Sequence, residues 1–436
     1  MAKKCVKGLC GLTVRGLFAL IIFLLILTPA FSQPLPGTTY NQTNYQELEG
    51  FALEPMVNWV KEGKLPVKVG ELNFSQWKKT PGYIKASIEN KDRYTINETN
   101  ILVHKNDGSV VNDIYGYPFS EIDADDPLKA QKLVENGLAA RYSMRAVCTK
   151  SVNYNFNINS LHNRSESLSG FLFYQQHPKG VLENPKGFLT QSYTLITQPF
   201  EMKGLCVISH IFAEDKEDTS YAYVPQLRRI IRTSSAARSE GVTGGELSLD
   251  DFAGWGGKNS SMNWRYLGKH QMLMPVTNTV IVPMDVGEDG SYPALNTKIK
   301  LGYTEKGFKG APWAPLNVTW VLRDLHAIEM TPKDPKYNYG KAVLYVDAEN
   351  YFMWAKTIFD RDMNYFKTVF LYASHRVGVK DGFDQVGYYD GYIVVNDKAN
   401  TASIVQLTSE GSRINLPVKK LSAKDFSVQS MVRRSK

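Results

Sequence analysis

The chain has 436 residues and a formal net charge of +8, from 51 lysines and arginines against 43 acidic residues. So mild an excess of basic residues does not indicate nucleic-acid binding. The length exceeds the usual size of one domain, but sheet-rich folds can pass about 200 residues as a single unit, and we expect one large domain over residues 45–410.

The first 32 residues are typical of a secretory signal peptide. Basic residues precede an unbroken apolar run from Leu17 to Leu27, and Ala30-Phe31-Ser32 supplies the small residues for cleavage after Ser32. The run is shorter than the roughly 18 apolar residues that a membrane-spanning helix needs. We therefore expect a cleaved signal and a periplasmic mature protein, with association with the outer membrane left open.

Two helices are predicted near the start of the mature chain, after a loose leader over residues 33–44. Apolar residues at steps of three and four over 45–60 predict the first, and Pro55 indicates a kink or a late start. The second is predicted to begin at Asp126, whose side chain can cap it, and to end at Gly137.

Beyond Ala139 the pattern changes to short β-rich runs separated by turn residues, which favours antiparallel strands. Residues 234–262 interrupt the series as an inserted loop, and residues 411–436 are predicted to form a polar, basic, solvated tail. The sequence thus predicts a mainly β (α+β) fold. The expected strands are 140–158, 168–176, 188–198, 203–213, 220–233, 263–274, 296–304, 317–331, 341–347, 351–359, 364–373, 386–396 and 402–408.

No constellation of residues typical of an enzyme or a metal site is present in the sequence. The seven histidines are scattered singly, and no nucleophile elbow or phosphate-binding loop occurs. Gly254–Lys258 is glycine-rich but follows a predicted helical turn instead of a strand. Acidic residues at Asp123–Asp126 and Glu246–Asp251 are interpreted as helix caps. We therefore predict no catalytic residue, no cofactor and no metal.

Cys148 and Cys206 are the cysteines that remain after signal cleavage, in a compartment that permits disulfides. Both lie in strand-like stretches. Two interpretations stay open, a disulfide between them and two buried small apolar residues.

Residues 221–232 carry three arginines in one predicted strand. Arg229 would then lie on one face, and Arg228 and Arg232 on the other. An arginine on the inward face needs either a carboxylate partner or a ligand anion, so a structural ion pair and a cationic lip for an acidic lipid headgroup are the two alternatives.

Several of these segments resemble a known family. The runs Tyr223–Arg232, Asp250-Asp251 and Asn263–Lys269 form the central similarity, flanked by Tyr115–Phe119 with Asp125–Pro127 and by Glu329–Lys333 with Tyr339–Asp347. Together they are similar to domain-of-unknown-function family 1329, a family of exported Gram-negative proteins described as outer-membrane lipoprotein-sorting.

The resemblance implies a lipoprotein-carrier-like fold, in which a large curved antiparallel sheet or half-open barrel has a few helices packed on its concave, apolar side. It also implies cooperation with a resistance-nodulation-division type exporter of the inner membrane. The chain is about twice as long as one minimal barrel of that kind. The additional strands are not explained by the resemblance.

These observations predict a periplasmic carrier or binding protein for a lipid, a lipoprotein or another hydrophobic ligand, with peripheral membrane contact left open. A non-enzymatic envelope adaptor that docks an exporter or outer-membrane complex is the alternative. An enzyme that uses Asp250, Asp251 or Asp347 is a third hypothesis, which no residue spacing favours. The candidate ligand-binding residues are Tyr223, Arg228, Arg229, Arg232, Trp264 and Tyr345.

Overall fold

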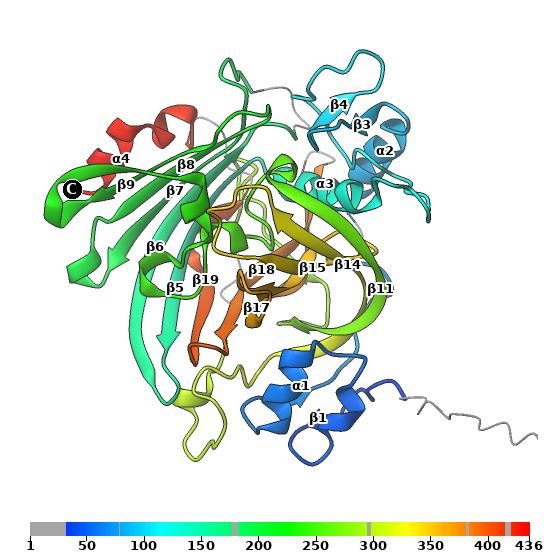
Figure 1. The fold of residues 1–436 in the computed structure, drawn as a ribbon, viewed down its shortest axis with the longest axis vertical. Helices are drawn as coiled ribbons and strands as arrows, with labels where there is room; N and C mark the ends of the chain where they lie inside the picture. The colour runs from blue at the N-terminus through cyan, green and yellow to red at the C-terminus, as the bar shows by residue number, and fades with distance from the viewer. Residues whose placement is uncertain (1–31, 78, 177–181, 294–297, 381–382, 415–419) are drawn as a thin grey trace, which may run out of the picture. The chain divides into compact units, whose positions relative to one another are not determined.

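One 15-stranded sheet, antiparallel in nearly all its pairings, dominates the structure (Figure 1). The computed structural model describes residues 32–77, 79–176, 182–293, 298–380, 383–414 and 420–436. The predicted signal peptide therefore lies almost entirely outside the described residues. A mainly β fold built on a large antiparallel sheet is confirmed.

The sheet has two halves, one open at an edge and one closed into a ring. In the first, the strands run side by side from the free edge at β10 to β18. They are β10 (Arg229–Thr233), β9 (Thr219–Val224), β8 (Cys206–Phe212), β7 (Phe188–Gln198), β6 (Leu161–Phe173), β5 (Ala146–Phe156), β19 (Thr401–Ile414) and β18 (Phe383–Asn396).

The second half curls into a closed ring of strands. β18 pairs along one side of β17. On its other side β17 pairs with β16 through Tyr365–Phe370 and meets β11 through a parallel bridge from Val276 to Ala373. The ring consists of β17 (Tyr365–Lys380), β11 (Met262–Val276), β14 (Thr319–Pro332), β15 (Lys341–Asp347) and β16 (Met353–Phe359). The remaining strands are β12 (Val282–Pro283) on β17, β13 (Tyr292–Pro293) on β19, and the pairs β1 (Thr39–Tyr40) with β2 (Val67–Lys68) and β3 (Tyr94–Ile96) with β4 (Leu102–His104).

Four α-helices and nine 3₁₀ turns occur in the described residues. The helices are α1 (Glu54–Lys61), α2 (Pro81–Glu89), α3 (Lys129–Tyr142) and α4 (Val428–Arg434). The 3₁₀ turns are η1 (Tyr45–Leu48), η2 (Phe200–Met202), η3 (Pro225–Leu227), η4 (Ser235–Ser239), η5 (Val242–Gly244), η6 (Leu249–Asp251), η7 (Asn259–Ser261), η8 (Gly302–Thr304) and η9 (Ala423–Phe426).

The N-terminal segment is more structured than predicted, and its helix starts later. The segment predicted as a loose leader is ordered, because Thr39–Tyr40 pairs with β2 and the Tyr40 side chain is fully buried. Pro55 lies in the first turn of α1, so the late start is the correct alternative.

The prediction that the second helix ends at Gly137 was wrong. Asp126 does accept the Leu128 amide at 2.7 Å, as a cap would, but α3 continues to Tyr142. A Cβ at Gly137 would lie 2.9 Å from the carbonyl oxygen of Tyr351. The glycine therefore serves close packing of α3 against the chain before β16.

The C-terminal tail is packed instead of solvated, which corrects a second prediction. Residues 411–414 belong to β19, and η9 and α4 place Phe426 and Met431 against the buried side chains of Cys206 and Ile208. On the same strand, Ile211 points to the other face and packs with α3. We call this second face of β5–β8 the inner face. α4 thus covers the outer face of these strands. The predicted strand at 296–304 is absent from residues 298–304.

Candidate functional site

Small hydroxyl and amide side chains cover much of the inner face of β5–β7. They alternate with side chains of the opposite face, as in Ser167 and Ser169 around Leu168. Neighbouring strands are linked through them, since Ser151 lies 2.8 Å from Ser167 and Ser169 lies 3.0 Å from Thr194. The surface is therefore polar but uncharged. Farther along the same strands it becomes apolar at Phe171 and Phe173.

The inserted segment 234–262, which we call the inner segment, lies against this face. Its Arg238 is buried and donates to Asp250 Oδ1 at 2.8 Å, to Ser209 Oγ at 2.7 Å and to the Gly256 carbonyl oxygen at 2.8 Å. These hydrogen bonds join two parts of the inner segment to each other and to β8. The predicted inserted loop is thus a folded part of the interior.

Buried charges tether the inner segment to the ring half of the sheet. Asp251 caps η6 and lies 2.6 Å from Lys356 of β16 and 3.3 Å from Lys367 of β17. Burial by itself would raise the pKa of Asp251, but the two ammonium groups outweigh it and hold the pKa well below its ordinary value. The carboxylate is therefore a structural anchor. The prediction that it caps a helix covers one part of this role.

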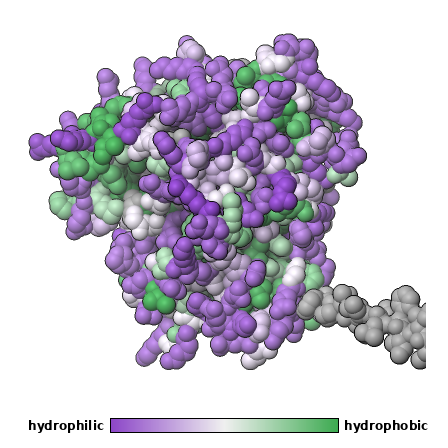
Figure 2. All heavy atoms as spheres, viewed as in Figure 1, coloured by the Kyte–Doolittle hydropathy of each residue, from purple (hydrophilic) through white to green (hydrophobic). Residues whose placement is uncertain are grey.

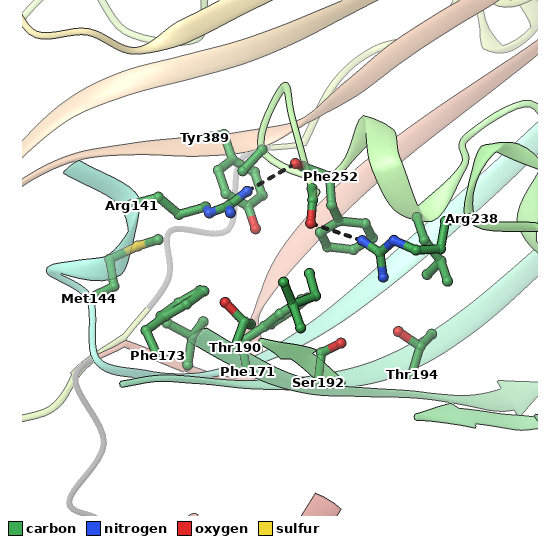
Figure 3. A pocket seen from close by; sticks show the side chains of 15 residues that line it. Arg141, Met144, Phe171, Phe173, Thr190, Ser192, Thr194, Arg238, Phe252 and Tyr389 are labelled. Carbon is green, nitrogen blue, oxygen red and sulfur yellow. Dashed lines mark hydrogen bonds between the residues drawn. The ribbon is translucent and has the colours of Figure 1, made fainter. Parts of the chain in front are cut away.

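A cavity of about 40 Å³ lies between the inner segment and the inner face (Figure 3). Phenyl and hydroxyl groups of the strands form one wall, and Phe252 forms the opposite one, 5.2 Å from Phe171 between ring centres. The lining residues are Arg141, Met144, Val147, Phe171, Phe173, Thr190, Ser192, Thr194, Ile211, Arg238, Leu249, Phe252, Ala253, Gly256 and Tyr389. The space suits about three water molecules.

Arg141, near the end of α3, contributes a cation to this cavity without forming an ion pair in the described part of the chain. Its Nη1 donates to the carbonyl oxygens of Phe252 and Trp255, and its Nε is buried without a hydrogen-bond partner. The Thr190 hydroxyl in the same cavity also lacks a partner. Unsatisfied buried polar atoms in one cavity indicate a place for a polar guest or ordered water.

A second cavity of about 40 Å³ continues the first along the strands. Thr194, Leu249 and Phe252 line both cavities. The second one lies over the hydroxyl-rich surface, with Val242 and Leu247 of the inner segment above it. Together they form one crevice with an apolar, cationic end and a neutral polar end.

A larger hollow of about 260 Å³ opens elsewhere, beside Glu62–Lys64, Lys309–Trp313 and Val395–Thr401. Its lining is mainly polar. It is wider than the crevice but lacks a charged side chain that is both buried and unpaired. We therefore regard the crevice as the candidate site.

The predicted ligand-binding residues do not meet in this crevice. Arg228 adopts a left-handed conformation at the turn between β9 and β10, with φ of 49°. The predicted single strand 220–233 is therefore a hairpin, which corrects that interpretation, and Arg228, Arg229 and Arg232 are exposed at the sheet edge. Because all three arginine side chains are exposed, none of them requires a buried partner.

The remaining candidates are dispersed. Tyr223 packs beside Cys206 on the outer face, and Tyr345 is half-buried against the core of the ring. Trp264 donates its indole N–H to the Asn259 carbonyl oxygen at 2.8 Å. Their assignment to a ligand stays a prediction.

Cys148 and Cys206 are both free, so the disulfide is not formed. The Lys258 side chain, which the glycine-rich run precedes, donates to the carbonyl oxygens of Glu214 and Lys216. Across the described ranges, no group of three or more histidine, cysteine or acidic side chains could hold a metal.

A family model described as "Protein of unknown function (DUF1329)" matches residues 82–432. No curated protein matches the chain. No helix among the residues that the structure describes has the length and apolar character to span a membrane.

Solved structures with a similar arrangement exist at low identity. A domain from Vibrio parahaemolyticus described as outer membrane lipoprotein-sorting is 16% identical, with a TM-score of 0.46, over 70% of this chain and 100% of its own. A DUF1329 family protein from Desulfovibrio piger is 12% identical, with a TM-score of 0.44, over 68% and 97%. A LolA superfamily protein from Nitrosomonas europaea is 13% identical, with a TM-score of 0.41, over 69% and 98%. These likenesses are too distant to transfer a ligand.

Proposed function

The chain belongs to the DUF1329 family of proteins of unknown function, and we propose that it is a non-enzymatic periplasmic protein that binds an amphipathic anion of the fatty-acid or acidic-lipid class. The observation that supports this most is Arg141, a cation without an ion-pair partner in the described residues, at the apolar end of an enclosed crevice. A buried guanidinium is stabilised by a carboxylate or phosphate. The phenyl groups of Phe171 and Phe252 suit the hydrocarbon part of such a ligand.

Glu135 is an acidic residue that interacts with Arg141, and it neutralises Arg141 only in part. The Glu135 carboxyl accepts a hydrogen bond from Asn259 at 3.1 Å, and burial raises its pKa to about 7, against the smaller effects of Asn259 and Arg141. Near neutral pH this carboxyl is therefore ionised only in part. Arg141 keeps an uncompensated positive charge that a ligand anion would satisfy.

Binding of a hydrocarbon chain requires the crevice to widen, because about three water molecules fill it as it stands. The tethers of the inner segment are unevenly distributed. Two of its buried ion pairs lead to β16 and β17, and a third joins Lys258 to Asp218 in the turn between β8 and β9, at 3.2 Å. No ion pair of the described residues joins the segment to β5, β6 or β7. We therefore propose that β5–β7, to which no ion pair of the described residues ties the segment, move away from it when a ligand enters.

The proposal can be tested with dodecanoate and its uncharged analogue dodecanol, by titration calorimetry on the mature chain. Dodecanoate should bind more tightly than dodecanol. Arg141→Gln should remove this preference, a loss of about tenfold in dodecanoate affinity, because a hydrogen bond to a charged group contributes on the order of 1.5–3 kcal/mol. Phe252→Ala should weaken both ligands alike.

Arg145→Gln is the matched control, since the Arg145 Nε is also buried and unpartnered but the residue does not line the crevice. It should leave the preference for dodecanoate unchanged. Native mass spectrometry of protein purified from the periplasm provides a second test. A chain that always emerges empty and binds neither probe would refute the proposal.

Delivery of the ligand to or from a resistance-nodulation-division exporter remains a prediction of the family resemblance. Cross-linking and purification from the native envelope would test it. A stoichiometric protein partner without a lipid would favour the adaptor alternative instead.

A further inference from the structure

Two neighbouring turns at the free end of the sheet expose large apolar side chains. Phe200, in the turn between β7 and β8, is 85% exposed, and Leu227, in the turn between β9 and β10, is 61% exposed. Ile230 and Ile231 of the edge strand β10 are 44% and 45% exposed. Figure 2 shows an apolar area at the left of the molecule, where Figure 1 places the β9–β10 hairpin and α4.

The two turns contact each other, so these side chains lie together at one end of the sheet, with Ile230 and Ile231 on opposite faces of β10. The Gln226 side chain donates to the Glu201 carbonyl oxygen. A Cβ at Gly204 would lie 3.2 Å from the Pro225 ring and 2.5 Å from the Ser435 carbonyl oxygen, so the end of α4 also adjoins this place. We call the surface formed by Phe200, Leu227, Ile230 and Ile231 the apolar tip.

Basic side chains surround the apolar tip. Arg228 and Arg229 are exposed and form no ion pair in the described residues, and Arg232 lies 3.5 Å from Glu217, with both side chains largely exposed. Lys203 is also exposed, next to the same turn. Within the two turns and the start of β10, Glu201 is the acidic residue against Lys203, Arg228 and Arg229, so positive charge is in excess there.

A protective role for the arginines does not explain the whole surface. Charged residues on an edge strand discourage pairing with other chains, and Arg229 and Arg232 can act in this way. Phe200 and Leu227, however, lie in turns outside the edge strand. Exposed aromatic and aliphatic groups would increase association instead of preventing it.

A second copy of the chain is disfavoured in the strand register that joins Ile230 to Ile231. Antiparallel pairing of two β10 strands that joins Ile230 to Ile231 would place Arg229 opposite Arg232 of the other copy. Like charges directly opposite one another in a sheet are destabilising. An anionic bilayer surface, in contrast, offers phosphates for the arginines and an apolar interior for the tip.

We propose that the apolar tip and its arginines attach the protein peripherally to an anionic bilayer. The apolar side chains enter the interface, and Arg228, Arg229 and Arg232 contact lipid phosphates. No residue of the apolar tip lines the crevice, and the proposal does not depend on the crevice or its ligand.

Co-sedimentation of the mature chain with vesicles tests the proposal. Vesicles of phosphatidylcholine mixed with phosphatidylglycerol should bind the protein, and vesicles of phosphatidylcholine alone should bind it much more weakly. Added salt should weaken the binding, because exposed charges are screened. The double variant Arg228→Gln and Arg229→Gln should weaken it about fivefold per arginine.

The double variant Phe200→Ser and Leu227→Ser should also weaken binding, including at high salt, because its effect is apolar. The matched control is Ile88→Ser with Arg93→Gln, which removes an exposed apolar and an exposed basic side chain outside the tip. It should bind like the unaltered chain, and unfolding midpoints should show that all variants fold. Binding that ignores lipid charge and the tip variants would overturn the proposal, as would a dimer that the tip variants dissociate.

Discussion

The Lys356 ammonium lies 2.6 Å from Asp251 Oδ1, and neither side chain has exposed surface. The Lys367 ammonium approaches the other carboxylate oxygen at 3.3 Å and also donates to the Glu246 carbonyl oxygen at 3.0 Å. These contacts join the inner segment to two adjacent strands of the ring. They explain why a long insertion between strands is held inside the sheet.

We expect Asp251→Asn to destabilise the protein by about 3–5 kcal/mol, because it leaves two buried ammonium groups without their counter-ion. The free energy of unfolding in urea measures this effect. Asp324→Asn is the control, since Asp324 forms an exposed ion pair with Lys269 at 2.8 Å. It should change the stability little. Equal losses for the two variants would contradict the anchoring role.

The stability of the folded chain should depend on the ionisation of Glu135. Burial is the largest cause that raises its pKa, from 4.5 to about 7. Between these pH values the unfolded chain is ionised there while the folded chain keeps the proton, so this group lowers stability as the pH rises, by about 3 kcal/mol in all.

Glu135→Gln should therefore be more stable than the unaltered chain above pH 7 and should lose that advantage near pH 4.5. The glutamine oxygen can still accept from Asn259. Unfolding in urea across this pH range gives the difference in the free energy of unfolding between the two proteins. Burial lowers the pKa of His326 to about 4, which has the opposite effect on stability, but His326 is present in both proteins and its contribution cancels in the difference. A difference that does not vary with pH would show that Glu135 is ionised in the folded state.

Gly137→Ala should destabilise the protein although alanine favours helices. The added Cβ would lie 2.7 Å from Met353 Cε, which can move, and 2.9 Å from the Tyr351 carbonyl oxygen, which belongs to the backbone. Overpacking of this kind costs about 1–3 kcal/mol. Gly82→Ala in α2 meets no atom within 4 Å and should be neutral or stabilising. Thermal unfolding of both variants distinguishes packing from helix propensity.

Both cysteines should remain thiols after export. Cys148 of β5 is in register with Gly170, Gly170 with Tyr193, and Tyr193 with Ile208 of β8, so two strands separate it from the strand of Cys206. Three strand spacings amount to about 14 Å, whereas a disulfide needs Cα atoms within about 7 Å.

Burial also raises the pKa of Cys206 to about 12, so its thiol should react slowly with iodoacetamide in the folded protein. Mass spectrometry after alkylation without reductant gives the answer. Two modified cysteines in the denatured chain are expected. An unmodified pair that reacts only after reduction would show that a disulfide forms.

The polar wall of the crevice is visible in the sequence as alternating small polar residues, but alternation alone does not say which face of the sheet they occupy. Ser165, Ser167 and Ser169 alternate with other residues, as do Thr190, Ser192 and Thr194, which predicts one small polar face on each strand. Nothing in one strand's sequence says whether that face is inner or outer. Arg141 was missed because it lies beyond the glycine that was expected to end its helix.

The segment 220–233 shows the opposite error, in which local pattern outweighed a breaking residue. Pro225 lacks an N–H for a central strand, and the chain turns there through η3 and Arg228. Had the proline been given more weight, the arginines would have been expected at a hairpin. Their exposure follows from the position of β10 at the sheet edge.

By itself the sequence determined the fold class and most strands, since alternation and turn residues act over a few neighbouring positions. β7 and β15 begin and end at the residues predicted. The tertiary structure alone decided that β11 meets β17 to close a ring, that Asp251 meets Lys356 across 105 positions of chain, and that the inner segment fills the interior. Such contacts depend on which distant elements become neighbours when the sheet curls, and no local pattern carries that information.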